Sequence, residues 1–362
     1  MAERSRERSR EKNREKKRTI SYFDYNLLFL IIFLICFGLV MLYSSSSYLC
    51  ANSAKYNYDG AYYLKLQVRN ALIGAAGMAF FAWVDYRVWK KFALLAYFVS
   101  IGLCVAVIFI GSESHGQARW IDLGPISFQP SEVAKVGLIV FMALVLELRA
   151  KQLDDWRNLA RVFGLLLPVV GAVAYNNLST AIIIAAISVC MIFVASPKYS
   201  HFLALGGVAI ALAIAGIAMF PYRLGRVDAW LHPESVSSDA TFQTMQGLYA
   251  IGSGGLFGKG LGESLQKMGN VPESQNDMIF TIICEELGLF GAVCLILLFM
   301  MVLWRMMVIA NNAPDLFGSL LVVGVMAHIA IQVILNIAVV TNSIPNTGVT
   351  LPFISYGGTS FA

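Results

Sequence analysis

The chain has 362 residues, of which 58% are apolar and only 14% charged, with a net charge of +5. A soluble globular domain carries about 25% charged residues, and the mean hydropathy here is +0.67, so an ordinary soluble protein is excluded. We expect an all-α polytopic membrane protein, because lipid leaves no partner for unpaired backbone groups and no barrel-like alternation is visible.

The first 21 residues form a basic tail, with nine Lys or Arg among the first twenty. Such a charge run is typical of a disordered topology anchor, although binding to anionic lipid or to a cytoplasmic partner stays open. We expect residues 22–362 to form a single transmembrane domain.

Nine apolar runs reach roughly the length that crosses about 30 Å of hydrocarbon. They are residues 26–43, 68–83, 92–111, 133–148, 160–175, 179–195, 202–221, 278–310 and 316–341. A tenth begins near residue 349 and stops at Ala362, too short to span, so we expect a truncated tenth span.

The eighth run is too long for one straight span, since 33 residues make a helix of about 50 Å. Either this helix tilts strongly or it breaks near Glu285-Glu-Leu-Gly288. If it breaks there, residues 278–284 form a separate helix in one half of the membrane.

Lys and Arg are distributed unequally over the two sides of the predicted bundle. A cytoplasmic tail places eighteen of them inside and eight outside, in agreement with the positive-inside rule. The long polar loop 222–277, between spans seven and eight, is then extracellular.

That loop carries the glycine-rich run Ile251-Gly-Ser-Gly-Gly-Leu-Phe-Gly-Lys-Gly-Leu-Gly262. It lacks the G-x-x-x-x-G-K-[ST] spacing of a nucleotide-binding loop, and no nucleic acid partner is expected either. Long loops usually carry function, so we expect the glycines to shape a surface against a long ligand or the neighbouring helices.

Several charged residues stand where charge is costly. Glu132 and Lys135 are three residues apart and can pair on one helix face, either as a functional pair or as a structural one. Arg119 beside Trp120 suits a phosphate at headgroup depth, or an aromatic-belt anchor. Arg223 and Arg226 follow the seventh span and favour an anionic ligand or ordinary headgroups.

Asp277 ends the polar loop, directly before Met278 and the eighth run. If the eighth run breaks near Gly288, Asp277 borders a cavity near the lipid headgroups. Its carboxylate is then placed to act on a lipid-linked sugar. The alternative is an N-cap, since aspartate is favoured at helix starts.

Four segments resemble the SEDS family, which includes RodA, FtsW and SpoVE. They are Gly116-Gln-Ala-Arg-Trp-Ile-Asp-Leu-Gly-Pro-Ile-Ser-Phe-Gln-Pro-Ser-Glu-Val-Ala-Lys135, Gln246–Gly262, Val271-Pro-Glu-Ser-Gln-Asn-Asp-Met-Ile-Phe280 and Leu351-Pro-Phe-Ile-Ser-Tyr-Gly-Gly358. The resemblance implies a ten-span bundle in the bacterial cytoplasmic membrane. It also implies a peptidoglycan glycosyltransferase that polymerises lipid II in cell division, sporulation or cell-shape maintenance.

The family's essential aspartate maps onto Asp277, which the resemblance makes the general base. It further implies a class B penicillin-binding transpeptidase as partner and a divalent cation, Mg²⁺ or Mn²⁺, whose ligands we do not assign. The predicted set that contacts lipid II or its pyrophosphate is Arg119, Trp120, Glu132, Lys135, Arg223, Arg226, Lys259, Glu285 and Ser355.

Two features qualify the resemblance. The chain reads Asn176-Asn-Leu-Ser-Thr-Ala181 where many members carry an acid, so no role is given to a carboxylate there. The opening Tyr22-Phe-Asp-Tyr25 favours the division and sporulation branch. A lipid II flippase and a non-catalytic scaffold for the transpeptidase are the alternative functions.

Overall fold

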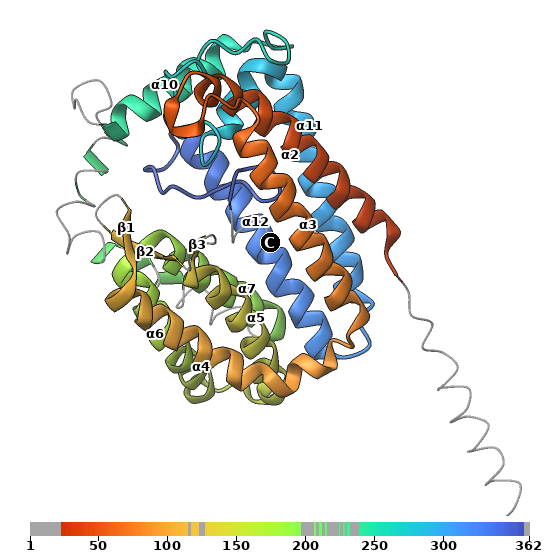
Figure 1. Ribbon diagram of the computed structural model, residues 1–362. Helices are drawn as coiled ribbons and strands as arrows, with labels where there is room; N and C mark the ends of the chain where they lie inside the picture. The colour runs from red at the N-terminus through yellow and green to blue at the C-terminus, as the bar shows by residue number, and fades with distance from the viewer. Residues whose placement is uncertain are drawn as a thin grey trace, which may run out of the picture.

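The computed structural model is predominantly helical, with a small sheet at one side (Figure 1). It describes residues 23–114, 117–122, 127–196 and 239–357, and isolated positions at 206–207, 210–211, 214–215, 224, 227–228 and 230–231. Side chains at 112–119, 122, 127 and 239–240 are not described. The predicted tail 1–21, most of the predicted span 202–221, and Arg223 and Arg226 lie outside these residues.

Eight long helices and one shorter helix build the described bundle. They are α2 (Tyr25–Ala51), α3 (Tyr62–Trp83), α4 (Arg87–Ile110), α5 (Pro130–Arg149), α6 (Trp156–Asn176), α7 (Leu178–Ala195), α10 (Asp239–Ser253), α11 (Ile279–Asn311) and α12 (Leu316–Val340). Short 3₁₀ turns lie at Ala54–Tyr56 and Ala150–Gln152. Six helices are long and apolar enough to cross a membrane, namely α2, α4, α6, α7, α11 and α12. The predicted spans 68–83 and 133–148 are also helical, in α3 and α5.

Local sequence explains where several helices begin. The side chains of Asp24, Asp155, Asn177 and Asp315 each accept a hydrogen bond from a backbone N–H in the first turn that follows. Such N-caps satisfy donors that have no partner within the helix. Pro130 opens α5, where its missing N–H costs nothing.

Two apolar cores are joined by one helix. The first core packs α4, α5, α6 and α7 together, and the second packs α2 and α11 with the segment before α11. Residues of α12 belong to both cores, with Val323 and Ala327 in the first and Ile329 and Val333 in the second. This helix therefore links the two halves of the bundle seen in Figure 1.

Of the two alternatives for the eighth run, a strong tilt or a break, the structure shows the break. Gly288 has φ 67° and ψ −168° inside α11, which is far from helical geometry. A left-handed φ favours glycine because it has no Cβ. The helix thus consists of a short first part from Ile279 and a long second part that ends at Asn311.

Two predicted loops contain regular structure. The polar loop 222–277 includes helix α10, and the segment before α5 forms an antiparallel sheet in the order β1 (Ser112–Ser114), β2 (Gln117–Asp122) and β3 (Ser127–Phe128). The fold is thus predominantly helical as expected, with a small sheet in a connection where no strand was predicted. Strand pairing satisfies the backbone groups of a polar connection, which apolar periodicity does not predict.

The tenth span does not begin as a helix near residue 349. Residues 349–357 form turns that lie across the end of α12, and Phe353 has a φ of 63°. The backbone N–H of Tyr356 donates to the carbonyl of Gln275 at 2.8 Å instead of to a helical neighbour. Long-range hydrogen bonds therefore replace the helical ladder expected from the apolar composition.

Candidate functional site

Asp277 is 8% exposed and lies at a junction of several segments. Its carbonyl oxygen accepts a hydrogen bond of 2.7 Å from Nδ2 of Asn336, which is fully buried on α12. The same Nδ2 donates to the carbonyl of Val349 at 2.8 Å. One buried amide therefore ties the backbone at Asp277 to α12 and to the segment 349–357.

Ser355 fixes the residues directly before Asp277. Its hydroxyl donates to the carbonyl of Asn276 at 2.7 Å and accepts from the backbone N–H of Leu351 at 2.8 Å. Gln67 of α3 donates to the carbonyl of Ser355 at 3.2 Å. Ser355, which was predicted to contact substrate, is thus a buried residue that stabilises the backbone beside the predicted base Asp277.

The carboxylate of Asp277 is flanked on both oxygens. Nε2 of Gln243, on α10, lies 3.5 Å from Oδ1. Gly348 lies by the other oxygen, since a Cβ built on it would stand 3.9 Å from Oδ2. The capping alternative is wrong, because Met278 is the N-cap of α11 and has no side-chain capping bond. The Asp277 carboxylate therefore lies between Gln243 of α10 and the turn at Gly348.

Glu285 anchors the glycine-rich run. Its side chain is fully buried and pairs with Lys259 at 2.6 Å, and Ser264 donates to it at 2.5 Å. The backbone N–H groups of Leu265 and Gln266 add bonds of 3.2 and 3.3 Å. Lys259 and Glu285, both predicted to contact substrate, therefore contact each other and hold the loop.

Glu286 forms a second buried ion pair, the Glu286–Lys267 clasp, which the sequence did not indicate. It pairs with Lys267 at 2.8 Å and accepts from the hydroxyl of Ser44, on α2, at 2.6 Å. Lys267 also donates to the carbonyl of Gly262 at 2.6 Å. Ser44 lies 242 residues from Glu286 in the chain, so no local pattern predicts this contact.

The predicted pairing of Glu132 with Lys135 is confirmed, with Nζ 2.8 Å from the Glu132 carboxylate. The Lys135 side chain is 1% exposed and that of Glu132 15%. A buried ammonium needs such a partner, because an uncompensated charge is expensive. His328 of α12, whose Nε2 is buried with no hydrogen-bond partner, lies within electrostatic reach of Lys135.

The remaining predicted residues are only partly placed. The backbone of Arg119 and Trp120 lies in β2, and the side chain of Trp120 is half-buried. Next to the start of α5, a small pocket is lined by polar and apolar groups, among them Gln129, Ser131 and Asn176. The amide Nδ2 of Asn176 is buried there without a partner.

Within the described part of the chain, no group of three or more His, Cys, Asp or Glu side chains is placed to hold a metal ion. The expected divalent cation therefore has no protein cage among these residues. Magnesium is commonly held by one or two carboxylates together with substrate phosphates.

Sequence reasoning missed Gln243 and Asn336. Asn336 carried a signal, since a carboxamide inside an apolar run is costly unless it is paired. Gln243 carried none, because it lies in a stretch interpreted as loop.

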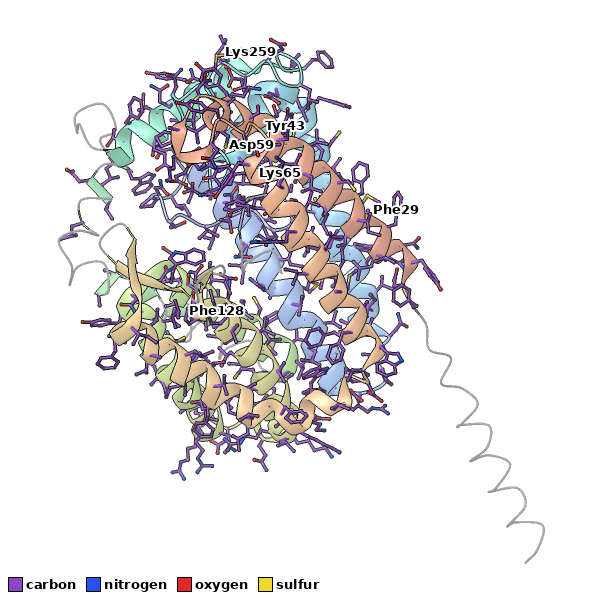
Figure 2. The ribbon with its side chains drawn as sticks, in the orientation of Figure 1. Phe29, Tyr43, Asp59, Lys65, Phe128 and Lys259 are labelled. Carbon is purple, nitrogen blue, oxygen red and sulfur yellow. The ribbon has the colours of Figure 1, made fainter. Side chains whose placement is uncertain are left out.

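In Figure 2, Lys259 lies at the same end of the bundle as Asp59 and Lys65, while Phe29 of α2 lies farther toward the other end.

A family model described as cell cycle protein, FtsW/RodA/SpoVE, matches residues 25–362. Stage V sporulation protein E of Bacillus subtilis (strain 168) is 39% identical over 345 residues, covering 93% of this chain and 92% of the relative. Probable peptidoglycan glycosyltransferase FtsW of Geobacter sp. (strain M18) is 38% identical over 342 residues, with 93% and 92% covered.

Solved structures are similar over the same length. A chain described under "Structural coordination of polymerization and crosslinking by a peptidoglycan synthase complex" superimposes with a TM-score of 0.77 at 27% identity, covering 94% of both chains. The crystal structure of rod shape determining protein RodA of Thermus thermophilus gives 0.68 at 27% identity, covering 94% of this chain and 92% of that one.

Proposed function

The chain belongs to the FtsW/RodA/SpoVE family of cell cycle proteins, and on that premise we propose that it is a peptidoglycan glycosyltransferase polymerising lipid II. Relatives named as peptidoglycan glycosyltransferases match almost their whole length. The observation in the chain itself that carries the proposal is the carboxylate of Asp277. It is nearly buried, and its backbone is clamped from α12 and from the segment 349–357.

Asp277 acts as general base in this proposal. As a hydroxyl oxygen of the acceptor sugar attacks the anomeric carbon of the donor, the carboxylate takes the hydroxyl proton. The bond from the anomeric carbon to the pyrophosphate oxygen breaks, and the undecaprenyl pyrophosphate leaves with the electron pair. A base that is positioned in this way contributes roughly 10²–10⁴-fold.

The leaving pyrophosphate needs positive charge, and the basic residues proposed to supply it are Arg119, Lys135, Arg223 and Arg226. Trp120 and Glu132 complete the proposed contacts near Lys135. Lys259, Glu285 and Ser355 remain proposed substrate contacts, and they also hold the loop and the backbone beside Asp277. A Mg²⁺ or Mn²⁺ ion is proposed to bind chiefly through the substrate's phosphates. To test this proposal, divalent cations are removed with a chelator and polymer formation is measured.

The proposed topology has ten spans, with the N-terminal tail cytoplasmic and loop 222–277 extracellular. Two contacts support it. Asp24 pairs with Arg305 at 2.5 Å at one end of α2, and Ser44 contacts Glu286 at the other. The ion pair at Asp24 and the contact with Glu286 thus lie toward opposite ends of α2. Reaction of single exposed cysteines with a membrane-impermeant label tests the sides.

A transpeptidase partner is also proposed, of the class B penicillin-binding type. The support is the similarity to a chain from a peptidoglycan synthase complex that coordinates polymerization and crosslinking. Co-purification with a class B penicillin-binding transpeptidase expressed in the same cell tests it.

The decisive experiment compares the purified protein with its Asp277→Ala and Asp277→Asn variants, using lipid II in detergent or vesicles. We expect polymer from wild type and at least a hundredfold less from either variant, within the contribution of a general base. Polymer that persists in both variants would remove Asp277 as base. Lipid II movement across vesicles without polymer would favour the flippase, and neither activity would favour the scaffold.

A further inference from the structure

Three polar side chains from separate segments form a chain that ends on Asp277. Nδ2 of Asn346 donates to Oε1 of Gln243 at 3.1 Å, and Nε2 of Gln243 lies 3.5 Å from Oδ1 of Asp277. Gln243 belongs to α10, and Asn346 belongs to the turn that follows α12. The bond between Asn346 and Gln243 therefore joins the turn after α12 to α10, and Gln243 extends this connection to the carboxylate.

The direction of each amide is set by its neighbour. The Oδ1 atom of Asn346 accepts a hydrogen bond of 3.0 Å from the backbone N–H of Gly348, which leaves its NH₂ group to donate elsewhere. That NH₂ group meets the carbonyl oxygen of Gln243, so the NH₂ of Gln243 must face away from Asn346 and toward Asp277. A reversed Gln243 amide would place two NH₂ groups against each other.

The turn from Asn346 to Gly348 lies near the carboxylate at Gly348 and is linked to it through Gln243. It reaches Oδ1 through Gln243, and it lies directly beside Oδ2 at Gly348. Gly348 has a φ of 67°, a left-handed conformation that glycine adopts without strain. The turn is thereby held in the shape that orients Asn346.

We propose that Gln243 is a positioning residue for the base Asp277, with its amide oriented by Asn346. The inference rests on the proposed glycosyltransferase function and extends it. The amide of Gln243, 3.5 Å from Oδ1, restricts the rotation of the carboxylate about its last bond. This fixes the position of the other oxygen, Oδ2, which in this proposal accepts the proton of the acceptor hydroxyl. The donor also favours the charged form of the carboxylate, which is the form that accepts a proton.

The test compares Gln243→Ala with Gln246→Ala, a matched change three residues farther along α10. Initial rates of polymer formation are measured against lipid II concentration and pH. For Gln243→Ala we expect kcat to fall about tenfold, as expected for a misplaced catalytic group, with KM changed less than about twofold. The acid limb of the pH–rate profile moves to higher pH, because the carboxylate loses a donor that stabilises its charge. Gln246→Ala should match wild type.

Two conservative variants keep the test independent of folding. Gln243→Glu preserves shape and the acceptor for Asn346, but it places a second carboxylate against Asp277. We expect it to move the acid limb further to higher pH than Gln243→Ala does. Asn346→Asp retains the acceptor for Gly348 and loses the donor to Gln243, and it should lower kcat in the same direction. Unfolding temperatures of all variants are measured in the same detergent.

The outcomes separate the two levels of the argument. Suppose that Asp277→Ala is inactive but that Gln243→Ala and Gln243→Glu keep the wild-type kcat and pH profile. This result overturns the positioning role and leaves the proposed function standing. A rise in KM at unchanged kcat overturns it too, in favour of a substrate contact. An active Asp277→Ala removes the base itself, and the role of Gln243 with it.

Discussion

Gly258 and Gly288 are packed against each other so tightly that neither position has room for a side chain. A Cβ on Gly288 would stand 2.3 Å from the backbone nitrogen of Gly258, and a Cβ on Gly258 would stand 2.1 Å from the carbonyl oxygen of Glu286. The glycine-rich loop therefore occupies the break in α11.

The loop also satisfies the backbone groups that the break exposes. The N–H groups of Lys259 and Gly260 donate to the carbonyls of Glu285 and Glu286 at 2.9 and 3.0 Å, and the N–H of Leu289 donates to the carbonyl of Gly255 at 2.9 Å. A kink inside an apolar bundle is stable only when such groups find partners. The glycines and the kink consequently depend on each other.

We predict that Gly258→Ala destabilises the protein by about 1–3 kcal/mol, the range for a side chain forced into a packed site. The added Cβ meets backbone atoms, which cannot move aside cheaply, and the φ of 80° adds strain. Gly252→Ala is the control, since a Cβ there meets nothing within 4 Å and lies in α10. Thermal unfolding in detergent measures the stability of both variants. Equal unfolding midpoints for the two would contradict the tight packing of the glycine-rich loop against the break in α11.

The excess length of the eighth run was predictable from sequence and left two alternatives, a strong tilt or a break near Gly288, of which the structure shows the break. The pairing of Glu132 with Lys135 was predictable because residues three apart share a helix face. Both inferences use only local geometry. They required no knowledge of which helices are neighbours.

The contacts that hold Asp277 were not predictable in that way. Asn336 lies 59 residues from Asp277 in the chain, and Ser355 lies 79 residues from Asn276. Their role follows from how α12 and the segment 349–357 fold back over the start of α11. A single sequence indicates that a carboxamide such as Asn336 needs a partner but not which distant residue supplies it, so the contacts of Asn336 and Ser355 beside Asp277 were not predicted.

We predict that the Lys267→Met variant loses about 3–5 kcal/mol, the cost of leaving a buried charge uncompensated. Lys267 and Glu286 have side chains that are 6% and 0% exposed, so the Glu286 carboxylate would keep only the hydroxyl of Ser44 among these partners. Denaturation in a graded detergent mixture measures the loss.

A matched control is available on the surface. Lys65 and Asp59 pair at 2.6 Å with side chains 68% and 35% exposed, and Lys65→Met should cost about 0–1 kcal/mol. The double variant Lys267→Met/Glu286→Gln should regain part of the loss, because it removes the stranded charge. If Lys267→Met proved no more harmful than Lys65→Met, the clasp would be unimportant for stability.

We predict that Ser355→Ala lowers kcat for polymer formation with little change in KM for lipid II. The variant loses the bonds to Asn276 and Leu351, each worth about 0.5–1.5 kcal/mol, and so loosens the backbone beside Asp277. Initial rates against lipid II concentration measure both constants. Ser343→Ala, at an exposed hydroxyl, is the control and should match wild type. A raised KM at constant kcat would instead indicate that Ser355 acts chiefly as a substrate contact.

We predict that the start of α12 contributes stability that is lost in acid. Burial raises the pKa of Asp315, but hydrogen bonds from the Gly318 N–H, the Tyr86 hydroxyl and Arg87 outweigh it, so the pKa lies below the ordinary 3.8. A lowered carboxyl pKa stabilises the fold at every pH above the unfolded-state value, and this stabilisation disappears as the pH falls through the folded-state pKa. The thermal unfolding midpoint of wild type should therefore decrease as the pH is lowered below about 4. The midpoint of Asp315→Asn should decrease less steeply over the same pH range. Asp154→Asn, at an exposed carboxylate, should follow wild type, and parallel curves for wild type and Asp315→Asn would show that Asp315 adds nothing in this range.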